Sequence, residues 1–234
     1  MTKRINYTEI PFLFPAHPVI SIAGAGGKTT LMFDLAKIYP GPAVMTTTTK
    51  VGSGQILKAD ICLELKNFPP KNPYNRMWVS PSLDSVNGKI TGCSPEEFSR
   101  LCQLCRNAGI TLIYEADGAA QKHIKAPAAH EPVIPEETDI CIYTVGLDVI
   151  GNPVNEDTVH RPELFTKITG LDHGAVIDTD SVISLVEHPE GGMKNVSVNA
   201  LRIAYLTHAN TAERIKAGEI IAAGLKSCDF VILR

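Results

Sequence analysis

The sequence has no strong excess of positive or negative charge, which argues against partners that bind through a highly charged surface. Its 234 residues include 22 Lys and Arg against 25 Asp and Glu, giving a formal net charge of −3. No block of basic residues stands out, so nucleic acid is not an expected partner. No apolar run approaches the ~20 residues that a membrane-spanning helix needs, so no membrane partner is expected either.

The amino-terminal segment also lacks the features of a secretory signal. Residues 1–15 start with basic side chains but contain no long apolar stretch and no small-residue cleavage site. We therefore expect a cytoplasmic protein. The length fits a single α/β domain over 1–234, and the connections near 118–190 leave room for a small subdomain. The oligomeric state is left open.

Cysteines are few, and their arrangement does not favour a metal or redox site. Of six cysteines, Cys102 and Cys105 form a C-x-x-C without a second such pair. Both lie in a predicted helix that begins at Ser94, with Glu97 completing a capping box, and that ends at Gly109. At helical spacing the two thiols share one face with apolar residues, which predicts buried core cysteines.

Apolar segments with strand character alternate with segments of helical character. Continuous apolar strands alternating with helices predict an α/β fold with a mostly parallel sheet flanked by helices. A short strand at 89–91 is expected to pair with the strand at 76–80 through the turn Asn87-Gly88. The other expected strands are 19–23, 42–45, 110–118, 139–148, 201–207 and 229–234, and the expected helices are 28–38, 95–108, 160–170, 180–188 and 211–228.

A glycine-rich segment separates the first strand from the first helix. It reads G-x-x-G-K-T, two residues shorter than the common phosphate-binding pattern G-x-x-x-x-G-K-[ST]. A helix start offers unpaired N–H groups and a partial positive charge, Lys28 adds a cation, and Thr29 adds a hydroxyl for Mg²⁺. The alternative is a tight turn with an exposed lysine. The candidate nucleotide-binding residues are Gly24, Ala25, Gly26, Gly27, Lys28, Thr29 and Thr30.

Two acidic residues end the strongly apolar strand at 110–118. Glu115 and Asp117 are two positions apart, so both are expected on one side of that strand. In phosphate-loop proteins an acid at this point contacts Mg²⁺ directly or through water. The alternative is a plain strand-end turn, and the sequence does not rank the two acids. Lys28, Glu115 and Asp117 are the candidate catalytic residues, and Thr29, Glu115 and Asp117 the candidate metal ligands.

Further polar residues lie where an anionic substrate or a partner could bind. Four threonines at 46–49 and Lys50 follow the second expected strand, whose end should adjoin the same crevice. Others lie in the long connection 118–138 and in the segment after the next strand. The candidate substrate or partner residues are Lys50, Lys125, His130, Glu131, His160 and Arg161.

Known families share these motifs. The short glycine loop resembles the ATP-binding G-x-x-G-K-[ST]-[ST] loop of the Mur ligases. The combination AGAGGKTT, TTTTK, YEADGAAQKHIKAPAAHEPVIP, VGLD and VHRPE, over about 19–170, resembles the YqeC family of selenium-dependent hydroxylase accessory proteins. That resemblance implies a phosphate-loop NTPase-like fold. It also implies a role in maturing selenium-dependent molybdenum hydroxylases, with the hydroxylase or its cofactor as the partner.

The motifs together predict a protein that binds Mg²⁺ and ATP and that hydrolyses the nucleotide or transfers a phosphate. Two alternatives stay open: an ATP-dependent ligase-like enzyme, and a non-catalytic nucleotide-gated carrier or chaperone for a cofactor. GTP is less expected than ATP. Residues 207–210 read T-H-A-N where guanine-binding relatives carry N-K-x-D, so Asn210 replaces the acid that pairs with guanine.

Overall fold

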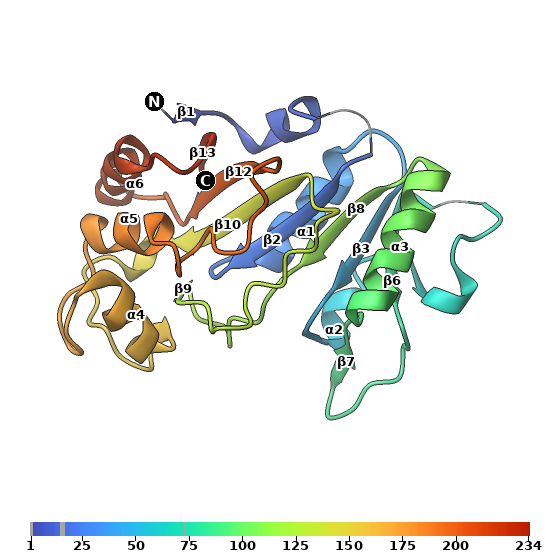
Figure 1. Cartoon of the computed structure of the whole chain (residues 1–234), viewed down its shortest axis with the longest axis horizontal. Helices are drawn as coiled ribbons and strands as arrows, with labels where there is room; N and C mark the ends of the chain where they lie inside the picture. Colours follow the sequence, from blue (N-terminus) through green and yellow to red (C-terminus); the bar gives the residue numbers. More distant parts are fainter. Residues whose placement is uncertain (1, 15–16, 73) are drawn as a thin grey trace.

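A computed structural model describes residues 2–14, 17–72 and 74–234. Within these residues the centre is a nine-stranded sheet with the order β1-β13-β12-β10-β2-β8-β3-β6-β5, in which every neighbouring pair runs parallel (Figure 1). The predicted α/β class is confirmed. The strands are β1 (Lys3–Arg4), β2 (Val19–Gly24), β3 (Ala43–Thr47), β5 (Ile61–Glu64), β6 (Arg76–Ser80), β8 (Thr111–Glu115), β10 (Ile140–Gly146), β12 (Leu201–Thr207) and β13 (Phe230–Leu233).

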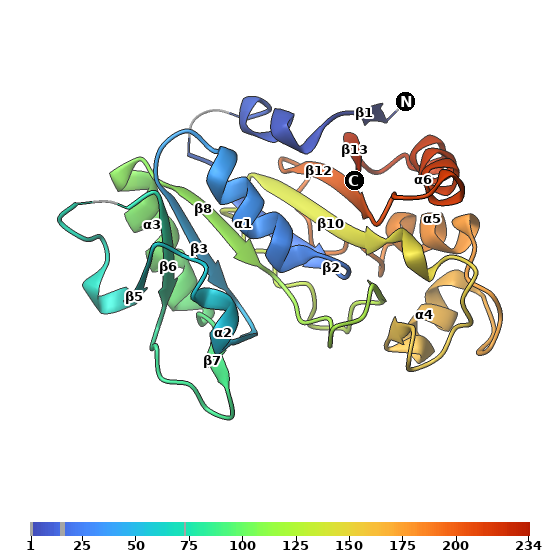
Figure 2. The same cartoon turned by 180° about the vertical axis from the view of Figure 1, so that it is seen from behind.

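Two hydrophobic cores lie on the two faces of this sheet, because its strands are apolar on both sides. Every residue of β2 and β10 is buried. One core joins the sheet to α1 (Lys28–Ile38), to the short helix α2 (Ser53–Ile56) and to the 3-10 helix η1 (Tyr7–Phe12). The other core joins it to α3 (Pro95–Ala108), α4 (Pro162–Thr169), α5 (Thr179–Glu187) and α6 (Ala212–Gly224). Figure 2 shows α1 lying across the face opposite α3.

The C-x-x-C prediction is confirmed within α3. The Ser94 hydroxyl accepts from the Glu97 N–H, and Glu97 accepts from the Ser94 N–H at 2.8 Å, which closes the capping box. Gly109 ends the helix with a φ of 64°. Cys102 and Cys105 are buried free thiols, and burial raises the pKa of Cys102 to about 12. A thiol with such a pKa is not a reactive nucleophile near neutral pH.

The expected pairing of the strand at 89–91 was wrong. The strand β7 (Lys89–Thr91) pairs antiparallel with β4 (Lys50–Gly52), so that Gly52 lies opposite Lys89. The reason is that β6 already lies between β3 and β5 and has no free edge. The sequence reading also did not include β5, whose residues are only half-buried at the sheet edge. The observed pairing brings Lys50 and Lys89 to the same side of the molecule.

The strand order places a ligand crevice at the end of β2. The chain leaves β2 through α1 and reaches β3 on one side, whereas β10 pairs with β2 on the other side. In open parallel sheets ligands bind outside the carboxyl ends of the strands where the order switches in this way. Segment 118–190 supplies β10 to the sheet and places α5 beside α6, with α4 packed on the other side of α5.

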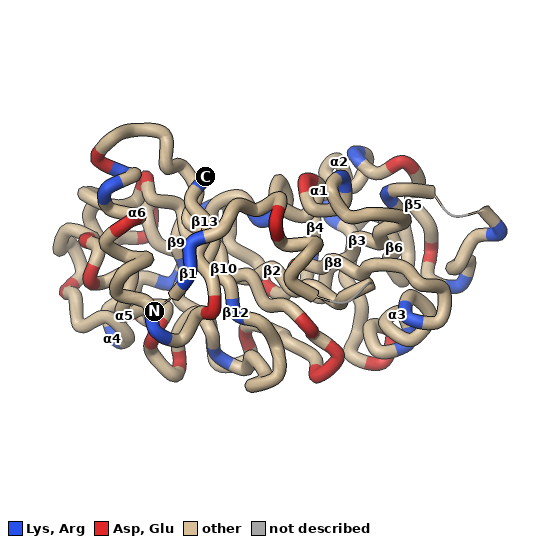
Figure 3. Tube along the Cα trace, turned by 90° about the horizontal axis from the view of Figure 1, so that it is seen from above, with Lys and Arg blue, Asp and Glu red and all other residues tan. Residues whose placement is uncertain are grey.

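Charged residues of both signs are interspersed over the fold, in keeping with the balanced composition. Figure 3 shows acidic and basic residues alternating over both halves of the molecule. Among the described residues, the helices are too short or too polar to cross a bilayer.

Candidate phosphate-binding site

The glycine loop turns sharply from β2 into α1, and its second half leaves backbone N–H groups without acceptors in the described structure. Gly26 and Gly27 have φ values of 83° and 105°, which residues with side chains rarely adopt. A Cβ atom on Gly26 would lie 2.8 Å from the Gly146 backbone nitrogen, so only glycine fits. In the described part of the chain, none of the N–H groups from Gly26 to Thr30 donates to another residue. Several free N–H groups at the start of an eleven-residue helix favour an anion.

The loop is held in place from both of its neighbouring strands. The Ala25 N–H donates to the Thr144 carbonyl of β10 at 2.9 Å, and the Thr144 hydroxyl donates to the Ala23 carbonyl at 3.0 Å. From β12, the Thr207 hydroxyl donates to the Gly26 carbonyl at 2.8 Å. These bonds fix the loop before any ligand binds, so little ordering entropy is lost on binding.

Lys28, the cation of the loop, is buried and held by two partners. Its ammonium donates to the Gly24 carbonyl at 2.7 Å and lies 3.1 Å from Asp117 Oδ1. The second contact is an ion pair without hydrogen-bond geometry, since Asp117 Oδ1 has no hydrogen-bond partner in the described structure. Because both partners lie at the base of the loop, they keep the ammonium beside the free N–H groups.

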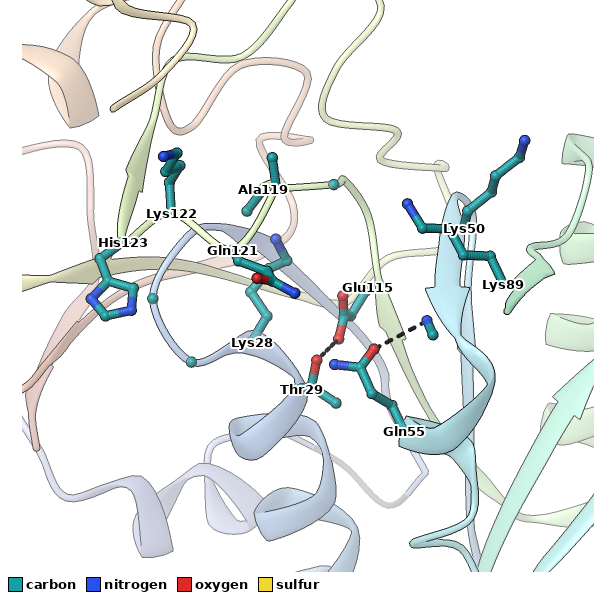
Figure 4. Close-up of a pocket in the computed structure, with 15 residues that line it drawn as sticks. Lys28, Thr29, Lys50, Gln55, Lys89, Glu115, Ala119, Gln121, Lys122 and His123 are labelled. Atoms are coloured by element: carbon teal, nitrogen blue, oxygen red, sulfur yellow. Dashed lines mark hydrogen bonds between the residues drawn. The ribbon is translucent and has the colours of Figure 1, made fainter. Parts of the chain in front are cut away.

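Glu115 lies beside Thr29, as a pair of magnesium ligands would. The Thr29 hydroxyl donates to Glu115 Oε1 at 2.5 Å (Figure 4). Burial raises the pKa of Glu115, against the opposing effects of the Lys28 charge and the Thr29 hydrogen bond. A half-buried carboxylate and a hydroxyl are hard oxygen ligands, so both residues fit Mg²⁺.

Asp117 occupies a different position from Glu115, although the two acids are only two residues apart. It is 1% exposed, accepts from the Gly24 N–H at 3.1 Å and lies between two buried lysines. The second is Lys125, whose ammonium is 3.0 Å from Asp117 Oδ2. Glu115 lines the cavity described below, whereas Asp117 holds the cations behind the loop.

The ion pairs continue from Asp117 to the start of α4. Lys125 is fully buried, donates to the Gly118 carbonyl at 2.7 Å and to Glu131 at 2.8 Å, and Arg161 donates to the same Glu131 oxygen at 2.6 Å. Burial by itself would raise the pKa of Glu131, but the hydrogen bonds from Arg161 and Lys125 outweigh it and hold that pKa at about 2. The residues Lys28, Asp117, Lys125, Glu131 and Arg161 are called the ion-pair chain below.

Two histidines flank the ion-pair chain without joining it. Burial, with the charges of Arg161 and Lys125, lowers the pKa of His160. His160 lies on β11 (Val159–His160), which pairs with β9 (Ile124–Lys125) so that it lies opposite Lys125. His130 is exposed on the turn before Glu131. The sequence-predicted residues 125, 131 and 161 are thus brought together, but Lys125 lies inside the protein and not on a binding surface.

A cavity of about 640 Å³ lies over the glycine loop. Figure 4 shows Lys28, Thr29 and Glu115 near its centre, with Lys50 and Lys89 on one side and Lys122 and His123 on the other. Its volume is in the range of small-molecule and cofactor sites. It is lined by Gly26, Gly27, Lys28, Thr29, Lys50, Gly52, Gln55, Lys89, Glu115, Gly118, Ala119, Ala120, Gln121, Lys122 and His123.

Sequence reasoning placed some of these lining residues and missed others. The loop residues 26–29, Lys50 and Glu115 line the cavity, while Gly24 and Ala25 are buried beneath the loop and Thr30 is exposed on α1. Residues 118–123 were recognised only as part of a long connection that is often functional. Lys89 and Gln55 carried no local signal. Lys89 reaches the cavity through the β4–β7 pairing, and Gln55 reaches it from α2, which follows β4 directly.

Comparison with known proteins agrees with the motifs. The YqeC protein family model matches residues 20–163, which include the glycine loop, both acids and Arg161. The chain belongs to the YqeC family. It is 31% identical over 225 residues to the uncharacterized protein YqeC of Escherichia coli (strain K12), covering 90% of this chain and 84% of that relative. No solved structure gives a significant match to the chain.

Proposed function

We propose that this YqeC-family protein binds a Mg²⁺–nucleoside triphosphate over the glycine loop and hydrolyses it or transfers its terminal phosphoryl group. The observation that carries the proposal is the row of free N–H groups from Gly26 to Thr30 around the Lys28 ammonium. A plain strand–helix turn would not need a buried lysine at its start. Phosphate oxygens would supply the acceptors that these donors lack.

Each residue of the site has a distinct part in this proposal. The loop N–H groups and Lys28 bind the phosphates and stabilise the charge that develops during phosphoryl transfer. Thr29 and Glu115 would hold Mg²⁺, which neutralises phosphate charge when bound. Asp117 acts as a positioning residue, since its contacts with Lys28, Lys125 and the Gly24 N–H fix the loop from below.

We propose ATP as the nucleotide in preference to GTP. Residues 207–210 begin at the last residue of β12, next to the loop, where the Thr207 hydroxyl donates to the Gly26 carbonyl. The amide oxygen of Asn210 already accepts from Arg214 at 2.9 Å, and Asn210 has no carboxylate to accept from the guanine N1 and N2 donors. The discrimination that a guanine-binding acid provides is therefore absent from this position.

The cellular role that we propose follows the family resemblance. The protein would take part in the maturation of selenium-dependent molybdenum hydroxylases. Hydrolysis or transfer of the nucleotide phosphate would drive a step that inserts or modifies the cofactor. The cavity extends from the phosphate loop to Lys50 and Lys89, which offers two cations for an anionic second substrate. This extension favours the ligase-like or phosphotransfer version of the proposal over simple hydrolysis.

The decisive variant for the metal-dependent part is Glu115→Gln, compared with Glu136→Gln at an exposed position. Calorimetric titration with ATP, with and without Mg²⁺, and phosphate release are measured for both. We expect Glu115→Gln to weaken Mg²⁺–ATP binding or turnover while sparing metal-free ATP, because the N–H groups still hold the phosphates. Equal loss with and without Mg²⁺ would contradict the assignment of Glu115 to the metal.

The cellular role has a separate test. A strain that lacks the gene is complemented with the wild-type chain or with the Glu115→Gln variant, and the activity of the selenium-dependent hydroxylase is measured together with its cofactor content. Restored activity with wild type alone supports a nucleotide-dependent step in maturation. Equal hydroxylase activity in the presence and absence of the gene would contradict the role. Phosphate release that appears only with an acceptor would support the ligase-like reaction, and nucleotide-dependent binding to the apo-hydroxylase without turnover would support the carrier.

A further inference from the structure

Two histidines and an aspartate converge beside the phosphate loop, outside the residues assigned above to phosphate and magnesium. The ligand atoms of His123, Asp148 and His208 all lie within 4.8 Å of one another. They come from three separate segments: the connection after β8, the 3-10 helix η3 (Leu147–Val149) after β10, and the residue after β12. We propose that these three side chains form a binding site for a first-row divalent transition-metal ion of the zinc class.

The contacts inside the cluster suit a metal site. His123 Nδ1 lies 2.6 Å from Asp148 Oδ2, and the rings of His123 and His208 stack with centroids 4.7 Å apart. Among the described residues, the other Asp148 oxygen is buried and has no hydrogen-bond partner. Burying an unpaired carboxylate oxygen is costly, and a cation bound by this carboxylate would offset that cost.

The backbone holds the three residues close to the phosphate loop. The Gly146 N–H donates to the His123 carbonyl at 2.7 Å, two residues before Asp148. His208 has a φ of 61° and directly follows Thr207, whose hydroxyl is bonded to Gly26. The cluster is therefore tied to the same strand ends that hold the loop.

The donor set selects the class of ion. Two imidazoles and one carboxylate suit Zn²⁺ and its first-row neighbours, whereas Mg²⁺ prefers an all-oxygen site such as Thr29 with Glu115. Three protein ligands leave a coordination position open, as in catalytic rather than structural zinc sites. His123 and Asp148 line a second cavity of about 440 Å³, from which water or a substrate atom would reach that position.

His123 also lines the larger cavity over the phosphate loop, so the two cavities share this side chain. An ion held by His123 would lie at the border between the proposed nucleotide site and the second cavity. Such an ion would bind a nucleophilic or anionic group of the second substrate and place it near the phosphates. The metal site itself stands on the three ligands and does not require that the proposed nucleotide reaction be correct.

Metal binding is tested on the purified full chain, first stripped with a chelator and then titrated with Zn²⁺ in excess Mg²⁺. We expect one Zn²⁺ per chain, with His123→Gln and His208→Gln each weakening binding at least about 100-fold, since even outer-shell substitutions cost 10–100-fold. The matched control is His173→Gln, an exposed histidine outside the cluster, which should bind as wild type does. Thermal melts of each variant verify folding.

A second measurement needs no substitution and distinguishes binding at the cluster from binding at any of the six cysteine thiols. Co²⁺ added to the wild-type chain should give a visible spectrum of a nitrogen- and oxygen-ligated ion, without a thiolate charge-transfer band. Imidazole NMR signals of two histidines should shift on Zn²⁺ addition. No bound Zn²⁺, a thiolate spectrum, or unchanged affinity in both cluster variants would overturn the proposal. These outcomes are independent of ATP binding, so failure here would leave the phosphate site to its own tests.

Discussion

The ion-pair chain and the opposite rim of the cavity both carry lysines, but the chain buries its lysines whereas the rim exposes them to solvent. Lys125 is fully buried between Asp117 and Glu131, and Lys28 is 6% exposed beside Asp117. Lys50 and Lys89, called the lysine rim, are exposed and form no ion pair with any residue that the structure describes. Paired buried charges fix a structure, whereas exposed charges remain available to a ligand.

The same difference separates Glu115, the last residue of β8, from Asp117, two residues beyond it. Glu115 faces the cavity, and in the described structure its carboxylate accepts a hydrogen bond from the Thr29 hydroxyl alone, so a ligand or ion could replace that bond. Asp117 is enclosed by Lys28, Lys125 and the Gly24 N–H. The comparison predicts that substitutions at the enclosed centre of the ion-pair chain affect stability most. Substitution of Lys28, the member of the chain that lines the cavity, should affect mainly ligand binding, and substitutions along the rim should affect ligand binding alone.

The largest effect is expected from Lys125→Met. Removing this ammonium leaves two buried carboxylates with one fewer cation each, and breaking a buried pair costs about 3–5 kcal/mol. We place the loss of unfolding free energy near the low end, because Asp117 keeps Lys28 and Glu131 keeps Arg161. Urea unfolding measures it, with Lys122→Met as the control, expected within about 0.5 kcal/mol of wild type. A loss under about 1 kcal/mol for Lys125→Met would contradict the structural role of the chain.

Acid should weaken the ion-pair chain through Glu131. Its pKa in the folded protein is about 2, below its usual value of 4.5, so its stabilising contribution is complete above pH 4.5 and is lost as the pH falls toward 2. The half-buried Glu115, whose pKa is raised chiefly by desolvation, contributes with the opposite sign. We expect the stability difference between wild type and Glu131→Gln to shrink over this window in urea unfolding series. A difference that stays constant from pH 6 to pH 3 would disagree with the ion pairing of Glu131.

Lys28→Ala should cost less in stability and act mainly on phosphate binding. A hydrogen bond to a charged group contributes roughly 1.5–3 kcal/mol, so triphosphate affinity should fall by on the order of 10- to 150-fold. Monophosphate affinity should fall less, since fewer charges reach the lysine. The control Lys37→Ala, in the last turn of the same helix, should bind as wild type does. If Lys28→Ala binds every nucleotide with wild-type affinity, the phosphate-binding role of Lys28 is contradicted and the loop is only a tight turn.

The smallest effects are expected from Lys50→Ala and Lys89→Ala. Exposed charges are screened by water and salt, so nucleotide affinity should change less than about fivefold and only at low ionic strength. Stability should be unchanged in thermal melts. If the rim binds a second substrate, the substitutions should raise the KM for that substrate and leave nucleotide affinity alone. A loss of stability similar to that of Lys125→Met would erase the distinction between rim and chain.

Local signals in the sequence were enough to find the loop and most of the sheet. Residues 24–30 form one continuous segment, and each central strand is a continuous apolar run, so residue spacing and hydrophobicity are enough to identify them. The pairing of β7 was misjudged because turn chemistry at Asn87-Gly88 identifies a reversal but not which strand has a free edge. The edge strand β5 lacked the strong apolar character of a central strand.

Contacts between segments that are far apart in the chain could not be predicted from the sequence. Glu115 and Asp117 looked equivalent because alternation fixes only a side of the strand, whereas their partners come from α1, from β9 and from the loop. Lys125 looked like a surface cation, although the fold encloses it. His123, Asp148 and His208 come together only through three strand ends, so no residue spacing could have indicated a metal site.

The central claim, that the glycine loop binds nucleotide phosphates, is tested most directly by calorimetric titration of the wild-type chain with ATP, GTP and CTP in Mg²⁺. The account predicts one saturable triphosphate site per chain, with ATP bound at least as tightly as GTP, and a site that is weakened in Lys28→Ala but not in Lys37→Ala. A preference for GTP above about tenfold, worth ~1.4 kcal/mol, would contradict the proposal that Asn210 does not select guanine. No detectable binding of any nucleotide to the folded wild-type chain would contradict the claim itself.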